Sequence, residues 1–343
     1  MGTTNLDWLE VSGVPTFGIA GAPLFTGNWY FVDPATGSDG NPGTPESPLA
    51  TLYQAHNLMT DGNNDVCVLV GDGTTAATAR LSLALAQTIT PAATSGTLNW
   101  TKSACHLIGM TAPTQVGQRA RIAPPAGTYT MATFGSGNFV VVSGQGCYFA
   151  NFSLFNGFST GGVSQICWTD NGGRNYYENV NFGGAGDAAS AQATTSRSLK
   201  IAGTTGENTF VGCTIGLDTV TKTVANASLE FSGGTPRNSF LGCTFPFQTS
   251  AATPLGIIVS AASGIDRWQK FDGCSFINNV ASTSTTMAGL ATMAASAGGL
   301  LLFKNCTLVG ITEFGTDATT RALEYVDGAA PTAGTSGIAV NPT

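Results

Sequence analysis

Phe271-Asp-Gly-Cys-Ser-Phe276 is one of six similar phrases that recur through the second half of the chain. The other five, in chain order, are Phe149-Ala-Asn-Phe-Ser-Leu154, Tyr177-Glu-Asn-Val-Asn-Phe182, Phe210-Val-Gly-Cys-Thr-Ile215, Phe240-Leu-Gly-Cys-Thr-Phe245 and Phe303-Lys-Asn-Cys-Thr-Leu308. Their fourth residues follow one another at steps of 28, 33, 30, 31 and 32 positions. A period in this range indicates a solenoid, in which each unit buries its apolar residues against its neighbours.

The positions within the phrase show which solenoid to expect. The first and last positions are apolar in all six copies and the position before the last is polar, which is the alternation of a β-strand. The third position holds only Asn or Gly, the residues that most readily take positive φ, so it predicts a bend. These features predict an all-β fold, a parallel β-helix over residues 28–310, with nine or ten rungs about 4.8 Å apart.

Opposite charges recur at the spacing of the rungs and are expected to pair on the outer surface. The sets at equivalent positions are Arg174, Glu207 and Arg237, then Lys200 and Glu230, then Asp272 and Lys304. Exposed pairs between neighbouring strands contribute little to stability, so we expect these charges to have a structural role.

Eight cysteines raise the question of disulfides or a metal site. Four of them, Cys213, Cys243, Cys274 and Cys306, hold the fourth position of consecutive phrases and are expected to point inward. Parallel side chains in neighbouring rungs hold their Cβ atoms farther apart than the ~3.8 Å of a relaxed disulfide. A linear stack without a histidine also offers no tetrahedral zinc site. We therefore expect free buried thiols, here and at Cys67, Cys105, Cys147 and Cys167, with neither metal nor cofactor.

Composition excludes two classes of partner. Only 10% of the 343 residues are charged, the formal net charge is −7 and there is no basic cluster, so a nucleic-acid partner is not expected. No apolar stretch approaches the ~18 residues that would predict a membrane span.

The first residues lack the basic start and apolar run of an export signal, so we expect the chain to stay in the cytoplasm in which it is made until assembly or lysis.

The two ends differ from the repeat. Residues 1–27 form an arm rich in Gly and Pro that carries Trp8, Leu9, Phe17 and Phe25 without a strand period. Large apolar groups on such an arm are expected to bind a partner, either a neighbouring subunit or a capsid protein. The alternative is that the arm folds back over the first rung as part of its cap. Residues 311–343 form a tail or cap, whose end could add a strand.

A short helix is predicted after the first strand. Ser47 is expected to be its N-cap, Pro48 its first residue, and Gly62 to follow its end. A helix in this place would cover the open edge of the first rung, which would otherwise be prone to aggregation.

A resemblance adds to these patterns. The segment Tyr30-Phe-Val-Asp-Pro-Ala-Thr-Gly-Ser-Asp-Gly-Asn-Pro-Gly-Thr44, the predicted helix and Val66-Cys-Val-Leu-Val-Gly-Asp72 resemble the opening of pectin-lyase-like right-handed parallel β-helix proteins. With the Phe-x-(Asn/Gly)-Cys-(Ser/Thr)-Phe rungs, residues 28–310 resemble the β-helix virion proteins of tailed bacteriophages. The resemblance implies a virion protein that decorates the capsid or projects as a spike, commonly as a homotrimer, in contact with other virion proteins such as the capsid shell.

The alternative is a tailspike that binds or cleaves cell-surface polysaccharide. Hydrolysis of a polysaccharide requires two carboxyl groups about 5 to 9.5 Å apart on an exposed face. The best candidates are Asp170, Asp187 and Asp218 in predicted turns, although a lone Asp in a turn usually caps backbone groups. Glu178 and Asp272 share an outer position but are three rungs apart. We therefore assign no catalytic residue.

Three further signals are interpreted as structural. His56 on the predicted helix and His106 in a strand are expected to be partly buried. The segment from Asp33 to Asp39 resembles a calcium loop but lacks its closing Glu, so a solvated turn is expected. A carbohydrate-binding module is disfavoured, because the aligned aromatic residues are predicted to point inward rather than to form an exposed stripe.

Overall fold

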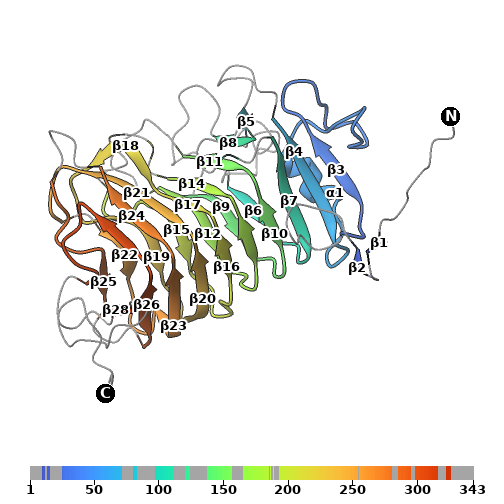
Figure 1. Cartoon of the computed structure of the whole chain (residues 1–343). Helices are drawn as coiled ribbons and strands as arrows, with labels where there is room; N and C mark the ends of the chain where they lie inside the picture. Colours follow the sequence, from blue (N-terminus) through green and yellow to red (C-terminus); the bar gives the residue numbers. More distant parts are fainter. Residues whose placement is uncertain are drawn as a thin grey trace.

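The computed structural model describes residues 10–11, 14–15, 25–71, 80–82, 97–111, 114, 120–123, 137–156, 165–184, 186, 188, 193–253, 255–279, 285–294, 298–315 and 322–325. Within these residues the chain is a stack of short strands wound into three parallel sheets (Figure 1). The prediction of an all-β parallel β-helix is confirmed.

The ten-stranded sheet, called sheet 1, begins with β3 and runs the length of the stack. Its strands are β3 (Trp29–Val32), β4 (Asp65–Val70), β7 (Cys105–Met110), β10 (Tyr148–Ala150), β13 (Tyr176–Glu178), β16 (Thr209–Val211), β20 (Thr235–Leu241), β23 (Ile265–Asp272), β26 (Leu300–Lys304) and β28 (Ala322–Tyr325).

Sheet 2 follows sheet 1 in each rung and has nine strands. They are β5 (Arg80–Ser82), β8 (Arg121–Ala123), β11 (Ser153–Phe155), β14 (Asn181–Gly183), β17 (Thr214–Ile215), β21 (Thr244–Thr249), β24 (Ser275–Asn278) and β27 (Thr307–Val309), with β18 (Leu217–Lys222) beside β21.

Sheet 3 completes the rung with seven strands. They are β6 (Leu98–Trp100), β9 (Asn138–Val142), β12 (Ile166–Asp170), β15 (Arg197–Ile201), β19 (Ala227–Phe231), β22 (Leu255–Val259) and β25 (Ala291–Met293). The neighbouring strands within each of the three sheets pair in parallel. A separate antiparallel pair, β1 (Glu10–Val11) and β2 (Val14–Pro15), lies in the N-terminal segment.

The bend between sheets 1 and 2 lies at the Asn or Gly of each phrase. All six residues have φ between 51° and 64°: Asn151, Asn179, Gly212, Gly242, Gly273 and Asn305. Residues other than Asn and Gly are disfavoured in this conformation, which explains why these six positions hold only these two residue types.

The core is a continuous column of stacked aromatic rings. Phe240 is fully buried between Phe210 and Phe271, at centroid distances of 4.6 and 4.7 Å. The stack begins with Phe149 and continues to Phe303. The first position of the phrase therefore provides the main apolar contact between rungs.

The cysteines form the expected ladder of free thiols. Each thiol of the ladder donates a hydrogen bond to the backbone carbonyl of the first aromatic residue of the preceding phrase. For example, Cys243 donates to Phe210 at 3.5 Å and Cys274 to Phe240 at 3.4 Å. Cys306, in the last phrase, is half-buried rather than buried.

The predicted start of the helix is wrong. Helix α1 spans Leu52–Leu58, and its N-cap is Thr51, whose hydroxyl accepts a hydrogen bond from the Gln54 amide. Ser47 and Pro48 lie in the extended segment that precedes it, since Leu49 pairs with β3 through hydrogen bonds to Phe31 and Asp33. The helix covers the first rungs through its buried face, as expected.

The ends of the chain are described only in part. Phe25 lies on the outer side of sheet 1, with its ring 4.2 Å from that of His106 and 5.6 Å from that of Tyr148. Trp8, Leu9 and Phe17 lie outside the described residues, so their assignment as partner-binding residues stays a prediction.

In the tail, β28 adds one strand to sheet 1. The described part of the chain contains no helix with the length and apolar character needed to span a membrane.

Candidate functional site

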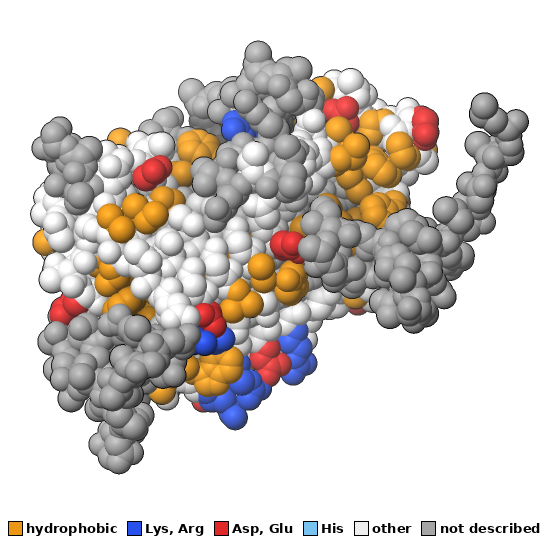
Figure 2. Space-filling model, viewed as in Figure 1, with side chains coloured by type: hydrophobic (Ala, Val, Ile, Leu, Met, Phe, Trp, Pro, Cys, Tyr) orange, Lys and Arg blue, Asp and Glu red, His pale blue; other side chains and the backbone are white. Residues whose placement is uncertain are grey.

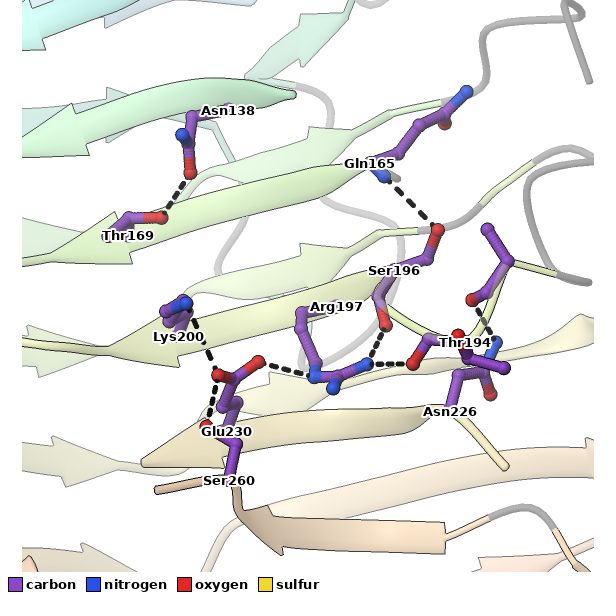
Figure 3. A network of polar contacts seen from close by, with 11 residues as sticks. Asn138, Gln165, Thr169, Thr194, Ser196, Arg197, Lys200, Asn226, Glu230 and Ser260 are labelled. Carbon is purple, nitrogen blue, oxygen red and sulfur yellow. Dashed lines mark hydrogen bonds and ion pairs between the residues drawn. The ribbon is translucent and has the colours of Figure 1, made fainter. Parts of the chain in front are cut away.

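The largest set of buried charges lies on the outer face of sheet 3. The outward column of this sheet runs through Val141, Thr169, Lys200, Glu230, Ile258 and Thr292. Glu230 in β19 is the centre of a polar network with Arg197, Lys200 and Ser260 (Figure 3). We call these four residues the Glu230 cluster.

Both oxygens of Glu230 are bound. Oε2 lies 2.7 Å from Arg197 Nε, while Oε1 lies 3.2 Å from Lys200 Nζ and accepts a hydrogen bond of 2.6 Å from the Ser260 hydroxyl. Arg197 and Glu230 are buried, with 4% and 6% of their surface exposed. The sequence predicted the Lys200–Glu230 pair as an exposed one; in the structure Glu230 is buried, while 25% of the Lys200 side chain is exposed.

Arg197 is held by the backbone as well as by Glu230. Its Nη1 donates to the carbonyl oxygens of Thr194 and Ser196, at 2.8 and 2.7 Å. These contacts fix the guanidinium group at the start of β15 (Figure 3). The sequence alignment missed Arg197, because the equivalent position in the next rung is Ala227, which offers no opposite charge.

The cluster keeps Glu230 ionised. Burial alone would raise the pKa of its carboxyl, but the Ser260 hydroxyl, Arg197 and Lys200 outweigh burial and hold this pKa below its ordinary value. Burial lowers the pKa of Arg197, although Glu230 opposes the shift. An ionised carboxylate bound by two cations is poorly suited to donate a proton as a general acid.

Lys222 is a second buried cation near the cluster. It lies at the end of β18 with 3% of its surface exposed, and its Nζ donates to the Ser228 hydroxyl at 3.0 Å. The Nζ atom also lies 5.9 Å from the centre of the Phe247 ring. Burial and the charge of Arg197 lower the pKa of Lys222 to about 8.

The three aspartates that were predicted as an acidic site are not brought together in the described residues. Asp170 lies in β12 and is fully buried, and Asp218 lies exposed in β18. The turn position predicted for both is therefore wrong, since each belongs to a strand. Asp187 lies outside the described residues.

Asp170 instead belongs to a polar network inside the solenoid. Its carboxylate accepts hydrogen bonds from the Tyr177 hydroxyl at 2.5 Å, the Asn175 amide at 3.0 Å and the Gly173 backbone at 2.9 Å. Burial raises the pKa of Asp170, and these hydrogen bonds oppose the shift. The position of Asp170 excludes contact with a substrate on the outer surface.

Asn175 is also the first member of a ladder that the sequence analysis missed. The side-chain oxygens of Asn175, Asn208, Asn238 and Gln269 each accept a hydrogen bond from a backbone N–H of the preceding rung. All four residues lie five positions before the fourth member of a phrase, so the aligned sequence contained this signal. The ladder satisfies buried backbone donors and is structural.

The histidines are structural, as predicted. His56 accepts a hydrogen bond at Nε2 from the Thr101 amide, and His106 accepts one at Nδ1 from the Tyr148 amide. Burial lowers the pKa of each imidazole to about 4.

The acidic turn near the N-terminus binds backbone groups. The Asp33 carboxylate accepts from the Ala35 amide and the Thr36 hydroxyl, at 2.8 and 2.6 Å. The Asp39 carboxylate accepts from the amides of Ala50 and Thr51, at 3.0 and 2.9 Å. Both carboxylates thus have the role that aspartate commonly has in turns.

Exposed charges pair across the turn that precedes sheet 1. Glu207 binds Arg174 at 3.0 Å and also binds Arg237, as the sequence predicted. Asp272, which was expected to face Lys304, is the register partner of Lys304 and forms an ion pair of 2.8 Å with Lys270 in its own strand.

The aligned aromatic residues point inward, as predicted, but the outward column of sheet 1 carries other aromatic side chains, two of which are exposed. The outward column of sheet 1 includes Trp29, His106, Tyr148 and Tyr176. Trp29 and Tyr176 expose 47% and 38% of their surface. The phrases hid this column, because its members lie one position before the inward aromatic residue and change to Thr209 and Ser239 in later rungs.

Comparison with known proteins places this geometry among the β-helix proteins. No protein-family model and no curated protein matches the chain. Solved structures do: pectin methylesterase PemA from Erwinia chrysanthemi superimposes with a TM-score of 0.56 at 14% identity, covering 92% of this chain and 93% of that one. The chain has the pectin-lyase-like right-handed parallel β-helix fold.

Two further structures agree. The pectin methylesterase from Aspergillus niger has a TM-score of 0.55 at 15% identity, over 89% of this chain and 85% of that one. The pectate lyase Pel9A has a TM-score of 0.50 at 12% identity, over 87% of this chain and 74% of that one. These neighbours of the β-helix fold are enzymes that act on polysaccharides, and at this identity the likeness shows the fold alone.

Proposed function

We propose that the chain is a non-enzymatic structural protein of a bacteriophage virion, which decorates the capsid or projects from it as a spike. The observation that carries the proposal is that the outward carboxylates in the described rungs do not form a pair available for catalysis. Glu230 in sheet 3 is bound by two cations, and Glu207 and Asp272 are each in an ion pair. The two outward carboxylates without an ion pair in these rungs, Glu178 in β13 and Asp218 in β18, lie on different sheets. Hydrolysis of a glycoside requires two available carboxyl groups.

A structural role also fits the surface. White atoms, which belong to the backbone or to side chains that are neither charged nor hydrophobic, make up much of the described surface in Figure 2, and most of the Lys and Arg side chains in view lie along the lower edge. Only 10% of the chain is charged, against about 25% in ordinary soluble domains. A surface of this kind suits packing against other copies and against a capsid shell, so we propose a homotrimer. Immunogold labelling of purified particles tests the location: gold over the shell or at a vertex or tail is expected, and unlabelled particles would contradict the proposal.

The second candidate is a tailspike that binds or cleaves cell-surface polysaccharide. It is favoured by one observation, the shared fold with pectin methylesterases and a pectate lyase over most of the chain. Incubation with capsular polysaccharide or lipopolysaccharide separates the two candidates. A structural protein releases neither reducing ends nor unsaturated sugars. Release that disappears in Asp218→Asn or Asp187→Asn would establish the second candidate.

A further inference from the structure

The outer face of sheet 1 contains an aromatic stack that ends abruptly. The rings of Tyr148 and Tyr176, in β10 and β13, stack at a centroid distance of 5.7 Å and an angle of 17°. In the same outward column the next residues are Thr209 and Ser239, and then Lys270. Because Thr209 lacks a ring that would extend the stack, the second face of Tyr176 is left open, in agreement with its 38% exposure.

Polar groups surround this ring. Glu178 lies two residues further along β13, half-buried, and its Oε2 accepts a hydrogen bond of 2.8 Å from the Tyr148 hydroxyl. Thr209 and Ser239 provide partly exposed hydroxyl groups in the next two rungs. Lys270, which forms an ion pair with Asp272, is the next residue of this outward column. It lies three rungs from Tyr176, or about 14 Å at ~4.8 Å per rung.

We propose that Tyr176, Glu178, Thr209, Ser239 and Lys270, called the Tyr176 patch, bind a neutral hexopyranose of an oligosaccharide. The apolar C–H face of a pyranose ring stacks on an aromatic ring, which presents a rigid apolar surface beside a polar hydroxyl. The Glu178 carboxylate accepts hydrogen bonds from sugar hydroxyl groups, and bonds to a charged acceptor are the stronger ones. The hydroxyl groups of Thr209 and Ser239 provide further donors and acceptors.

Charge selects the class of sugar. Lys270 and Asp272 form an ion pair three rungs from Tyr176, whereas Glu178 places a carboxylate in the same strand as the stacking ring. The carboxylate of an acidic sugar would therefore be repelled, whereas a neutral sugar would not. The site is separate from the Glu230 cluster, which lies on sheet 3, and it adds a binding activity to the structural role proposed above.

Calorimetric titration with neutral tri- and tetrasaccharides of glucose, galactose and mannose, and with trigalacturonate, tests the proposal. We expect at least one neutral ligand to bind the wild type, and Tyr176→Ala to weaken that binding at least tenfold. Tyr176→Phe keeps the stacking ring and should retain most of the affinity. Tyr53→Ala is the matched control, because Tyr53 on α1 is exposed to the same 38% and should leave binding unchanged.

A second variant keeps the test independent of any effect of Tyr176→Ala on folding. Glu178→Gln replaces the charged acceptor with a neutral amide of the same size and should weaken binding about threefold or more, while the circular dichroism spectrum stays unchanged. The proposal is overturned if none of the neutral ligands binds at millimolar concentration, if Tyr176→Ala or Glu178→Gln binds like the wild type, or if trigalacturonate binds more tightly. These outcomes leave the structural role untouched, because particle incorporation is measured separately.

Discussion

The thiol of Cys243 donates a hydrogen bond to the backbone carbonyl of Phe210, one rung earlier, at 3.5 Å. The same contact recurs between Cys274 and Phe240 and between Cys306 and Phe271. Burial raises the pKa of Cys243 well above its ordinary value, so the reactive thiolate is scarce in the folded chain.

A thiol-modifying reagent should therefore distinguish folded from unfolded protein. We expect Cys306, the half-buried member, to react first and slowly, and the seven buried thiols to react only after unfolding, when all eight become accessible. Mass spectrometry of the labelled chain measures this. Rapid modification of Cys243 or Cys274 in folded protein would contradict their inward position.

Phe240→Ala should be strongly destabilising. The ring is fully buried and stacks on both neighbouring rungs, so its removal leaves a cavity and should lower the free energy of unfolding by about 3 to 5 kcal/mol. Cys243→Ala removes one small group and should cost about 1 kcal/mol. Urea unfolding of both variants gives the comparison, and equal losses would argue against the aromatic column as the main contact.

The buried Glu230–Arg197 ion pair should contribute more to the free energy of unfolding than the exposed ion pairs of Glu207. Glu230→Gln leaves the buried Arg197 without its counter-charge and should lower the free energy of unfolding by about 3 to 5 kcal/mol. Glu207→Gln is the matched control, because its partners Arg174 and Arg237 are exposed and the change should be small. A small effect of Glu230→Gln would show that the cluster is not buried in solution.

Stability should fall as the pH falls from about 6.5 to 4. His56 and His106 have pKa values lowered to about 4 in the folded chain, so the unfolded chain binds more protons throughout this range. The double variant His56→Gln/His106→Gln should show a shallower loss, since its acid-sensitive imidazoles are gone. Melting temperatures at pH 7, 5.5 and 4.5 measure the difference, and identical slopes for the two proteins would contradict the assignment.

Repetition explains which features could be predicted from the sequence. Positions that recur in each phrase, such as the bend at Asn151 or Gly242 and the inward Phe240, experience the same environment in each rung, so the aligned columns report it directly. The Arg174–Glu207–Arg237 pairing followed from the same alignment.

Features outside the phrase could not be predicted in this way. Asp170 lies in sheet 3, whose strands are joined to the phrases by connections of variable length, so its register was not visible. Arg197 binds Glu230 diagonally rather than within one aligned column. The start of α1 depended on the pairing of Leu49 with β3, a contact between segments that local signals at Ser47 and Pro48 do not report. The Tyr148–Tyr176 stack spans only two rungs and forms no repeat.

We predict that the N-terminal arm links the chain to its partner in the particle. Because Phe25 contacts the outer side of sheet 1, a deletion of residues 2–24 retains this contact and removes Trp8, Leu9 and Phe17. We expect the deleted chain to keep its circular dichroism spectrum and melting temperature but to lose assembly with its partner. A large drop in melting temperature would indicate instead that the arm belongs to the cap of the first rung.

The most direct test of the structural role is the copy number of the chain in purified particles, measured by quantitative mass spectrometry against the major capsid protein. A decoration protein should be present in hundreds of copies and a spike in a small multiple of three, and in either case the copies should remain through density-gradient purification. Absence of the chain from purified particles would contradict the account.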